Sequence, residues 1–167
     1  MSETKCVFRW TDIYKVNVAV LDQQHQGLFD TVNELERALR LGEGDAVIDG
    51  ILDRLVTYAG VHFAAEESLM ERHSFPGLPT HRIQHEMFRE KMATLLDRHR
   101  DAKAGVAVEL LLFLQTWLKQ HVLRTDKQYT AFLNARGVHL PSSQYFQLFK
   151  SAPGGAVCSM CLTISGQ

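Results

Sequence analysis

The hydrophobic residues of this chain recur mainly at the i, i+4 and i+7 spacing that brings them to one face of an α-helix. Four segments carry such a stripe, at 21–39, 48–70, 81–99 and 110–132. Clusters of glycine, proline and polar residues separate them: LGEGD at 41–45, SFPGLPT at 74–80 and DAKAG at 101–105. Asp22 and Asp45 are plausible N-terminal caps of the first two helices. The pattern predicts four long amphipathic helices.

Four such helices joined by short connections predict an all-α protein, an antiparallel up-down-up-down four-helix bundle. Residues 1–20 lack a helical repeat and are expected to form an extended N-terminal arm. The helical pattern covers 21–137. Residues 138–167, partly apolar and without periodicity, are expected to form a C-terminal tail.

Composition and charge narrow the function classes. The chain has 167 residues, 46% of them hydrophobic and 22% charged, which fits one globular domain. A formal net charge of -1 without a basic run predicts no nucleic-acid partner. The N-terminus has no apolar signal region, and no stretch reaches the roughly 18 apolar residues of a membrane span. Three cysteines form no disulfide framework. The expectation is a cytoplasmic protein without a membrane span.

Each of the four predicted stripes contains at least one histidine, and three of them add a second polar residue. Residues four apart on a helix project from the same face. At i+5, however, two residues lie roughly 140° apart, so the polar pair of the last stripe needs a long reach or a local distortion of the helix. The seven residues are His25, His62, Glu66, His81, His85, His121 and Asp126.

Five imidazoles and two carboxylates cannot share an apolar core without partners, because each unpaired buried polar group costs about 1–3 kcal/mol and a charge costs more. A metal centre satisfies them together. The absence of cysteine from these stripes disfavours a closed structural zinc site. Two six-coordinate ions with bridging carboxylates and an oxygen bridge would leave about one open position, which is typical of non-haem iron that binds a small ligand.

Four motifs carry a resemblance to a known family: DQQHQGLFDTVNEL at 22–35, HFAAEESLM at 62–70, HRIQH at 81–85 and WLKQHVLRTD at 117–126. With the preceding FRWTDIYKVNVAVLD, they resemble the hemerythrins, specifically the bacterial single-domain bacteriohemerythrins. The resemblance implies two non-haem iron ions with an oxo or hydroxo bridge. His81, His85 and His121 would hold one ion, and His25 and His62 the other. Glu66 and Asp126 would bridge them, at the family's own spacing.

The resemblance also implies that dioxygen binds at the open position of the two-histidine iron. Trp117 and Leu118 stand at the family's oxygen-pocket positions. Four further residues are expected to add apolar walls or to be plain core: Leu28, Phe29, Val32 and Phe63. An apolar surround limits access of water to a metal.

Other polar residues near these motifs favour ordinary roles. Tyr58 is expected to pack against the core, and Glu67, about 100° round the helix from Glu66, to be a surface charge. His73 is expected to be solvated. His99 is expected to be a hydrogen-bonded boundary residue.

The sequence therefore favours reversible binding of dioxygen for storage, delivery or buffering, without catalysis. One alternative is a sensor of oxygen, redox state or nitric oxide that signals through the arm or the tail. Another is a di-iron enzyme that detoxifies peroxide or nitric oxide, with Cys158 and Cys161 relaying electrons. The tail, which also contains YFQLF at 145–149 and His139, could dock on an oxygen-consuming enzyme or a signalling protein.

Overall fold

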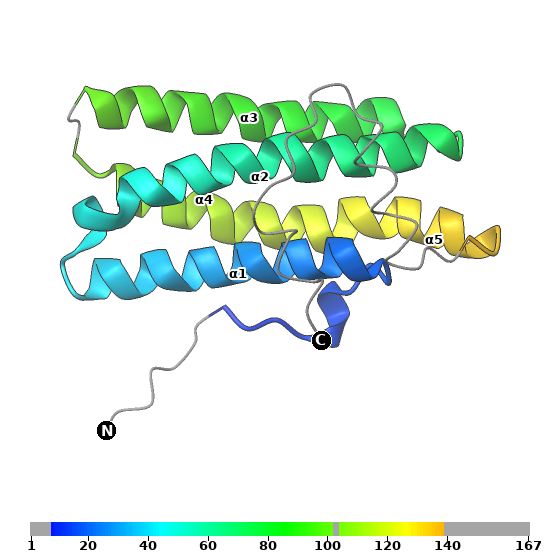
Figure 1. The fold of residues 1–167 in the computed structure, drawn as a ribbon, viewed down its shortest axis with the longest axis horizontal. Helices are drawn as coiled ribbons and strands as arrows, with labels where there is room; N and C mark the ends of the chain where they lie inside the picture. Colours follow the sequence, from blue (N-terminus) through cyan, green and yellow to red (C-terminus); the bar gives the residue numbers. More distant parts are fainter. Residues whose placement is uncertain (1–7, 102–103, 139–167) are drawn as a thin grey trace, which may run out of the picture.

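The computed structural model describes residues 8–101 and 104–138, and every regular element among them is a helix. Four long rods lie side by side in alternating directions (Figure 1). They are α1 (Ala19–Arg40), α2 (Gly44–Arg72), α3 (Leu78–Arg100) and a fourth, composite rod. The composite rod consists of α4 (Val106–Gln120), the π-helical turn η2 (His121–Asp126) and α5 (Lys127–Ala135). The predicted all-α four-helix bundle is confirmed.

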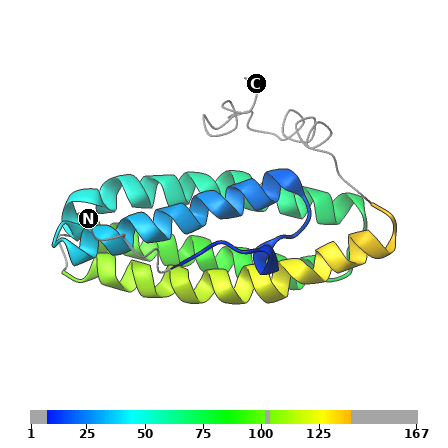
Figure 2. The same ribbon diagram turned by 90° about the horizontal axis from the view of Figure 1, so that it is seen from below.

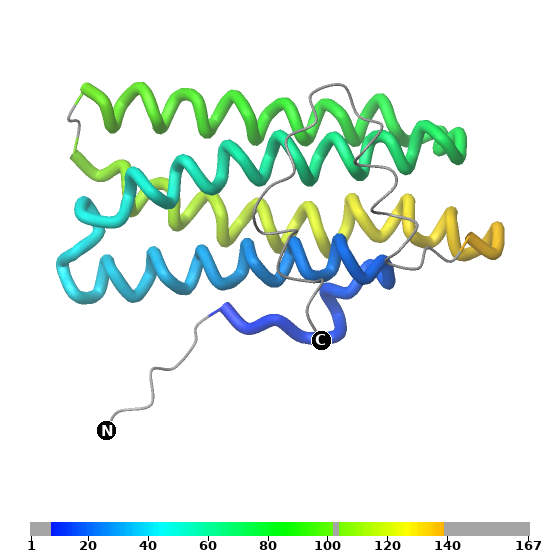
Figure 3. Tube along the Cα trace, viewed as in Figure 1, coloured from blue at the N-terminus to red at the C-terminus, as the bar shows by residue number. Residues whose placement is uncertain are grey.

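The four rods form a closed ring around one interior. α1 contacts α2 and α4, α3 contacts α2 and α4, and α2 and α4 also contact each other. The tube in Figure 3 shows the chain turning back between α1 and α2 and between α2 and α3. None of the described helices has the length and apolar character needed to cross a membrane.

The interior contains two apolar clusters separated by a polar layer. The larger cluster includes Phe29, Leu55 and Phe88, and the smaller one includes Leu69 and Leu133. On α1 the buried His25 lies between Leu21 of the small cluster and Leu28 of the large one. The other rods repeat this order, so the polar residues of all four rods meet at one level of the bundle.

The helix boundaries differ from the sequence-based prediction in two places. Asp22 does not cap α1, because the helix begins at Ala19; instead its Oδ1 accepts a hydrogen bond from the Val16 N–H at 2.6 Å. Asp45 likewise lies inside the first turn of α2, which starts at Gly44. Acidic side chains in a first turn still stabilise the positive end of the helix dipole. The predicted turns hold, and Gly42 and Gly105 adopt the positive φ values of 75° and 81° that glycine tolerates.

The segment before α1 is folded onto the bundle rather than simply extended. It contains a short 3-10 helix, η1 (Asp12–Tyr14), which contacts η2. Figure 2 shows the segment running along the outside of the bundle over α1 and the fourth rod. The rings of Phe8, Trp10 and Tyr14 all lie within 5.2 Å of Phe29, measured between ring centroids. Part of the predicted arm therefore belongs to the core.

Asn33 fastens this segment to α1 with two hydrogen bonds. Its Oδ1 accepts from the Phe8 N–H at 3.1 Å, and its Nδ2 donates to the Phe8 carbonyl at 2.9 Å. We expect Asn33→Ala to lower the free energy of unfolding by about 1–3 kcal/mol and to speed tryptic cleavage after Arg9. Urea denaturation and timed proteolysis measure the two effects. Asn134→Ala, the same change at an exposed helical position, is the control; equal effects of both variants would contradict this role.

Candidate metal centre

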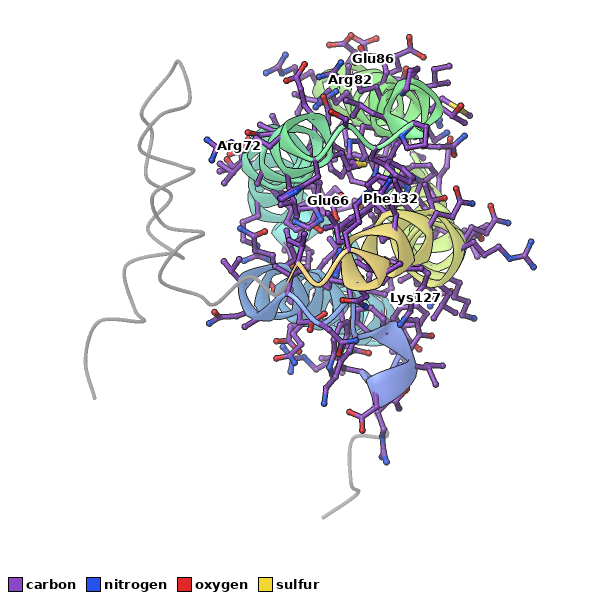
Figure 4. All side chains as sticks on the ribbon, turned by 90° about the vertical axis from the view of Figure 1, so that its right-hand side faces the viewer. Glu66, Arg72, Arg82, Glu86, Lys127 and Phe132 are labelled. Atoms are coloured by element: carbon purple, nitrogen blue, oxygen red, sulfur yellow. The ribbon has the colours of Figure 1, made fainter. Side chains whose placement is uncertain are left out.

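The layer between the two apolar clusters contains all seven polar residues that the sequence singled out. Each is at most 2% exposed. They come from every rod of the bundle: His25 from α1, His62 and Glu66 from α2, His81 and His85 from α3, and His121 and Asp126 from η2. Figure 4 views the bundle end on and shows Glu66 inside the ring of helices. Helical periodicity was enough to place the histidines and Glu66 on core faces, whereas Asp126 needed a local distortion of its helix.

Two groups of ligand atoms share Glu66. The first joins it to His81, His85 and His121, and the second joins it to His25 and His62, with the ligand atoms of each group within 4.8 Å of one another. Glu66 Oε2 lies 3.2 Å from His85 Nε2 and 3.7 Å from His62 Nε2. The other oxygen, Oε1, accepts a hydrogen bond from the Tyr129 hydroxyl at 2.6 Å. Glu66 therefore stands between a three-histidine group and a two-histidine group.

Asp126 also stands between the two groups, with one oxygen toward each. Its Oδ2 lies 3.4 Å from His25 Nε2, and its Oδ1 lies 3.1 Å from His121 Nε2. His81 Nε2 is 3.5 Å from the same Oδ1. Both carboxylates of the layer thus lie within 3.7 Å of imidazole nitrogens from both histidine groups.

The π-helical turn η2 removes the difficulty of the i+5 spacing. Residues His121–Asp126 follow the i→i+5 hydrogen-bond pattern of a π-helix, which has more residues in each turn than an α-helix. This wider turn brings residues five apart to the same face, so His121 and Asp126 both point into the layer. Such single π-turns occur frequently at functional sites. The local distortion that the spacing required is therefore present.

The polar atoms of the layer lack enough protein partners to satisfy one another. Among the described residues, Nε2 of His25, Nε2 of His62, Oε2 of Glu66 and both carboxylate oxygens of Asp126 are buried without a hydrogen bond. Nε2 of His85 lies only 3.1–3.2 Å from the Nε2 atoms of His81 and His121. Unpaired buried polar atoms are costly, whereas cations in their midst would satisfy several lone pairs at once. The donor set fits metal ions.

Burial keeps most of these imidazoles neutral, as a metal ligand must be. It lowers the pKa of His25, it lowers that of His62 well below the ordinary value, and it lowers that of His121 to about 3. Burial also opposes the charge on Glu66, but the surrounding imidazoles outweigh it and hold the pKa of Glu66 well below its usual value. For Asp126, burial and the negative charge of Glu66 together raise the pKa to about 8. Without cations, the layer can therefore accommodate one carboxylate charge more easily than two.

Aromatic rings stack on three of the five histidines. Tyr58 stacks on His62 with ring centroids 4.6 Å apart, and Trp117 stacks on His121 at 4.2 Å. Both pairs are four residues apart on one helix. Phe63 of α2 stacks on His85 at 3.8 Å with an interplanar angle of 7°. Tyr58 therefore packs as expected, and the ring that it packs against is that of a candidate ligand, His62.

The six residues expected to line an oxygen pocket all lie in the larger apolar cluster, next to the layer. Each is at most 9% exposed. They are Trp117, Leu118, Leu28, Phe29, Val32 and Phe63. They form an apolar surround on one side of the histidines.

Two polar residues that contact the ligands were not recognised from the sequence. Gln24 Oε1 lies 2.7 Å from His62 Nδ1, and Glu67 Oε1 lies 2.8 Å from His85 Nδ1. The prediction that Glu67 is a surface charge was wrong, because its side chain is only 17% exposed and contacts α3. Hydrogen bonding to His85 and the neighbouring guanidinium groups overcome the effect of burial and lower the pKa of Glu67. The sequence signal was the pair of arginines, Arg82 and Arg89, that flanks His85.

The remaining histidines stay outside the layer. His99 is paired with Asp49 at 2.8 Å, which confirms its expected role as a hydrogen-bonded boundary residue. His73 is partly exposed at the C-terminal end of α2. His139, Cys158, Cys161 and the YFQLF segment lie outside the described residues, so the expectations for them are untested.

A four-helix bundle that buries five histidines and two carboxylates in one layer defines a metalloprotein with its site in the bundle core. Comparison with known proteins is consistent with this class. The Hemerythrin HHE cation binding domain matches residues 16–133. The chain belongs to the hemerythrin family, whose cofactor is a pair of non-haem iron ions, and its buried groups are able to hold metal ions.

Individual relatives show the extent of the likeness. A bacteriohemerythrin of Stenotrophomonas maltophilia is 32% identical over 120 residues, covering 72% of this chain and 77% of that protein. A bacteriohemerythrin of Clostridium acetobutylicum is 28% identical, covering 74% and 98%. The crystal structure of a hemerythrin point mutant superimposes with a TM-score of 0.68 at 28% identity, covering 75% of this chain and 96% of that one.

The raised pKa of Asp126 predicts how the stability of the metal-free protein changes with pH. Between its ordinary pKa of 3.8 and about 8, the folded metal-free protein keeps a proton that the unfolded chain has released, so this carboxyl lowers stability as the pH rises. Asn cannot titrate. The unmodified metal-free protein should therefore lose stability between about pH 5 and pH 8, and Asp126→Asn should not. The difference in free energy of unfolding between the two proteins should grow in favour of the variant over this range.

Urea denaturation of both metal-free proteins at several pH values measures this difference. Asp53→Asn, which removes an exposed carboxylate on α2, is the control and should show a much smaller change. Stability curves for Asp126→Asn and the unmodified protein that stay parallel across this range would contradict the assignment.

Proposed function

We propose that this protein binds dioxygen reversibly at a carboxylate-bridged di-iron centre. The observation that carries the proposal is the placement of Asp126, whose two oxygens face different histidine groups. Together with Glu66, it supports two metal positions rather than one. The relatives are named bacteriohemerythrin and myohemerythrin, which supports the same role.

The two positions have unequal ligand sets. His81, His85 and His121 would hold one iron ion, and His25 and His62 would hold the other. Glu66 and Asp126 would be shared between the two ions. The two-histidine ion has one imidazole fewer, so about one coordination position remains for a small ligand there. When bound, the iron pair supplies the electrons and the open position that dioxygen requires.

The chain's own residues keep this position apolar and orient its ligands. Stacking by Tyr58 and the hydrogen bond to Gln24 hold the ring of His62. Nearby, the cluster that contains Phe29, Phe63 and Trp117 limits the access of water. Exclusion of water and protons favours release as dioxygen, since loss of hydrogen peroxide or reduction to water would consume protons.

The described residues favour binding over catalysis. Apart from the seven layer residues, the buried side chains of the described ranges with a hydroxyl beside the layer include Thr130 and Tyr129, and Tyr129 donates its hydroxyl to Glu66 at 2.6 Å. In those ranges no lysine, cysteine or further carboxylate is fully buried beside the layer, whereas a proton-transferring enzyme needs a positioned acid or base. A carrier, store or buffer of dioxygen needs none.

The ligand assignment predicts the iron content of two variants. His62→Ala and Glu66→Ala should each lose the stable di-iron site, because each removes a ligand and Glu66 serves both ions. Iron measured per folded chain after reconstitution checks this. His99→Ala removes a histidine that pairs with Asp49 outside the layer and should retain two irons. Retention of two irons by either ligand variant would overturn the assignment.

The proposed function predicts a reversible optical change. The reduced, iron-loaded protein should be nearly colourless without oxygen, develop visible absorption in air and lose it again under vacuum. Repeated cycles in a sealed cuvette measure this. Irreversible oxidation on first exposure would contradict reversible binding and favour redox chemistry or sensing. A protein that takes up no iron would overturn the proposal as a whole.

A further inference from the structure

Glu67 links the metal layer to the outer face of the bundle. It follows Glu66 directly on α2, but its side chain points toward α3 and is 17% exposed. Oε1 lies 2.8 Å from His85 Nδ1. Oε2 accepts a hydrogen bond from Arg82 Nε at 3.2 Å, and an Arg89 nitrogen lies 3.4 Å from Oε1. The carboxylate therefore has one partner inside the bundle and two cations near its surface.

The orientation of His85 determines which of its nitrogens each partner meets. Nε2 faces the layer, 3.2 Å from Glu66 Oε2. Nδ1 faces away from the layer, toward Glu67. An imidazole that binds a metal through Nε2 has no proton there, so the proton of His85 would lie on Nδ1 and donate to the carboxylate of Glu67, which can only accept. Phe63 stacks on the flat face of the ring and restricts its rotation.

We propose that Glu67 is a positioning residue of the di-iron centre that acts through His85. This inference rests on the proposed function, because it takes His85 as an iron ligand. The hydrogen bond fixes the tautomer that presents Nε2 to the metal. The negative charge behind Nδ1–H also makes the imidazole a stronger electron donor, which stabilises the ferric state over the ferrous state.

The two histidine groups receive different support from their surroundings. His62 in the two-histidine group contacts the neutral amide of Gln24, at 2.7 Å from its Nδ1. His85 in the three-histidine group contacts a carboxylate. The extra negative charge of Glu67 thus lies behind a histidine of the three-histidine group, whose ion would have no open position. The charge of Glu67 would therefore change the reduction potential of the iron pair without lying on the side where a small ligand would bind.

The arginines hold Glu67 in place and connect it to the surface. Arg82 also contacts Glu71 at 3.6 Å, and Arg89 contacts Glu86 at 3.2 Å. Figure 4 shows Arg82 and Glu86 on the outer face of α3, away from the interior. Arg89 additionally lies over the ring of Phe63, 5.3 Å from its centroid. Glu67 and Phe63, the two groups that restrain His85, are therefore both in contact with Arg89.

The test compares Glu67→Gln with Glu86→Gln. Glutamine at 67 keeps a hydrogen-bond acceptor of the same length but removes the charge. Glu86→Gln removes the same charge from another partner of Arg89, one that pairs with no histidine. For Glu67→Gln we expect a higher reduction potential, measured by anaerobic spectroelectrochemical titration, and a loss of iron affinity of about 10–100-fold. Glu86→Gln should change neither.

A second measurement needs no variant. In the ¹⁵N-histidine-labelled protein loaded with diamagnetic Zn²⁺, the proton of His85 should reside on Nδ1 and be protected from exchange with solvent. A His85 without a proton on Nδ1 would overturn the inference, as would a Glu67→Gln potential equal to that of Glu86→Gln. These outcomes differ from a failure of the proposed function, in which the unmodified protein itself would not bind two irons or would not release dioxygen.

Discussion

The organisation of this bundle depends on seven polar side chains buried at one level of its interior. Left to themselves, two carboxylates and five imidazoles in an apolar core carry a large desolvation cost, and their inward nitrogens and oxygens have too few protein partners. Metal ions bound at this level would use the same atoms as ligands and so offset this cost. The apolar clusters on either side provide the stability that the polar layer lacks, and they exclude water from it. The two apolar clusters therefore stabilise the fold, and the polar layer between them forms the candidate site.

In the composite fourth rod, a local change of helix type brings two polar residues into the buried layer. His121 and Asp126 are five residues apart, a spacing that an ideal α-helix would spread round its circumference. A single π-turn brings both side chains inward, after which α5 continues and delivers Tyr129 to Glu66. The N-terminal 3-10 helix contacts this turn from outside. The π-turn η2 is therefore contacted by η1, and α5, which follows it, is fixed to α2 by the Tyr129–Glu66 hydrogen bond.

The groups around the layer act on the orientation and the electronic properties of its ligands. Stacked rings hold three imidazoles, and hydrogen bonds to Gln24, Glu67 and Tyr129 fix two imidazoles and one carboxylate. The three hydrogen bonds connect different helices, and the two histidine groups receive different partners: an amide at His62 and a carboxylate at His85. A protein of this kind can adjust ligand affinity and redox behaviour through residues that never touch the metal.

Much of the fold and the candidate ligand set follow from the sequence alone. Helical periodicity placed His25, His62, Glu66, His81 and His85 on core faces because each needs only its own helix to point inward. The i+5 spacing of Asp126 indicated a distortion but not its form. The roles of Glu67 and Gln24 depended on which neighbouring helix each side chain meets and at what height, so intrahelical spacing misassigned the first and overlooked the second. The docking of Phe8, Trp10 and Tyr14 on Phe29 has the same cause. Local patterns decide which way a side chain points from its own helix, whereas only the packing of the rods decides what it meets there.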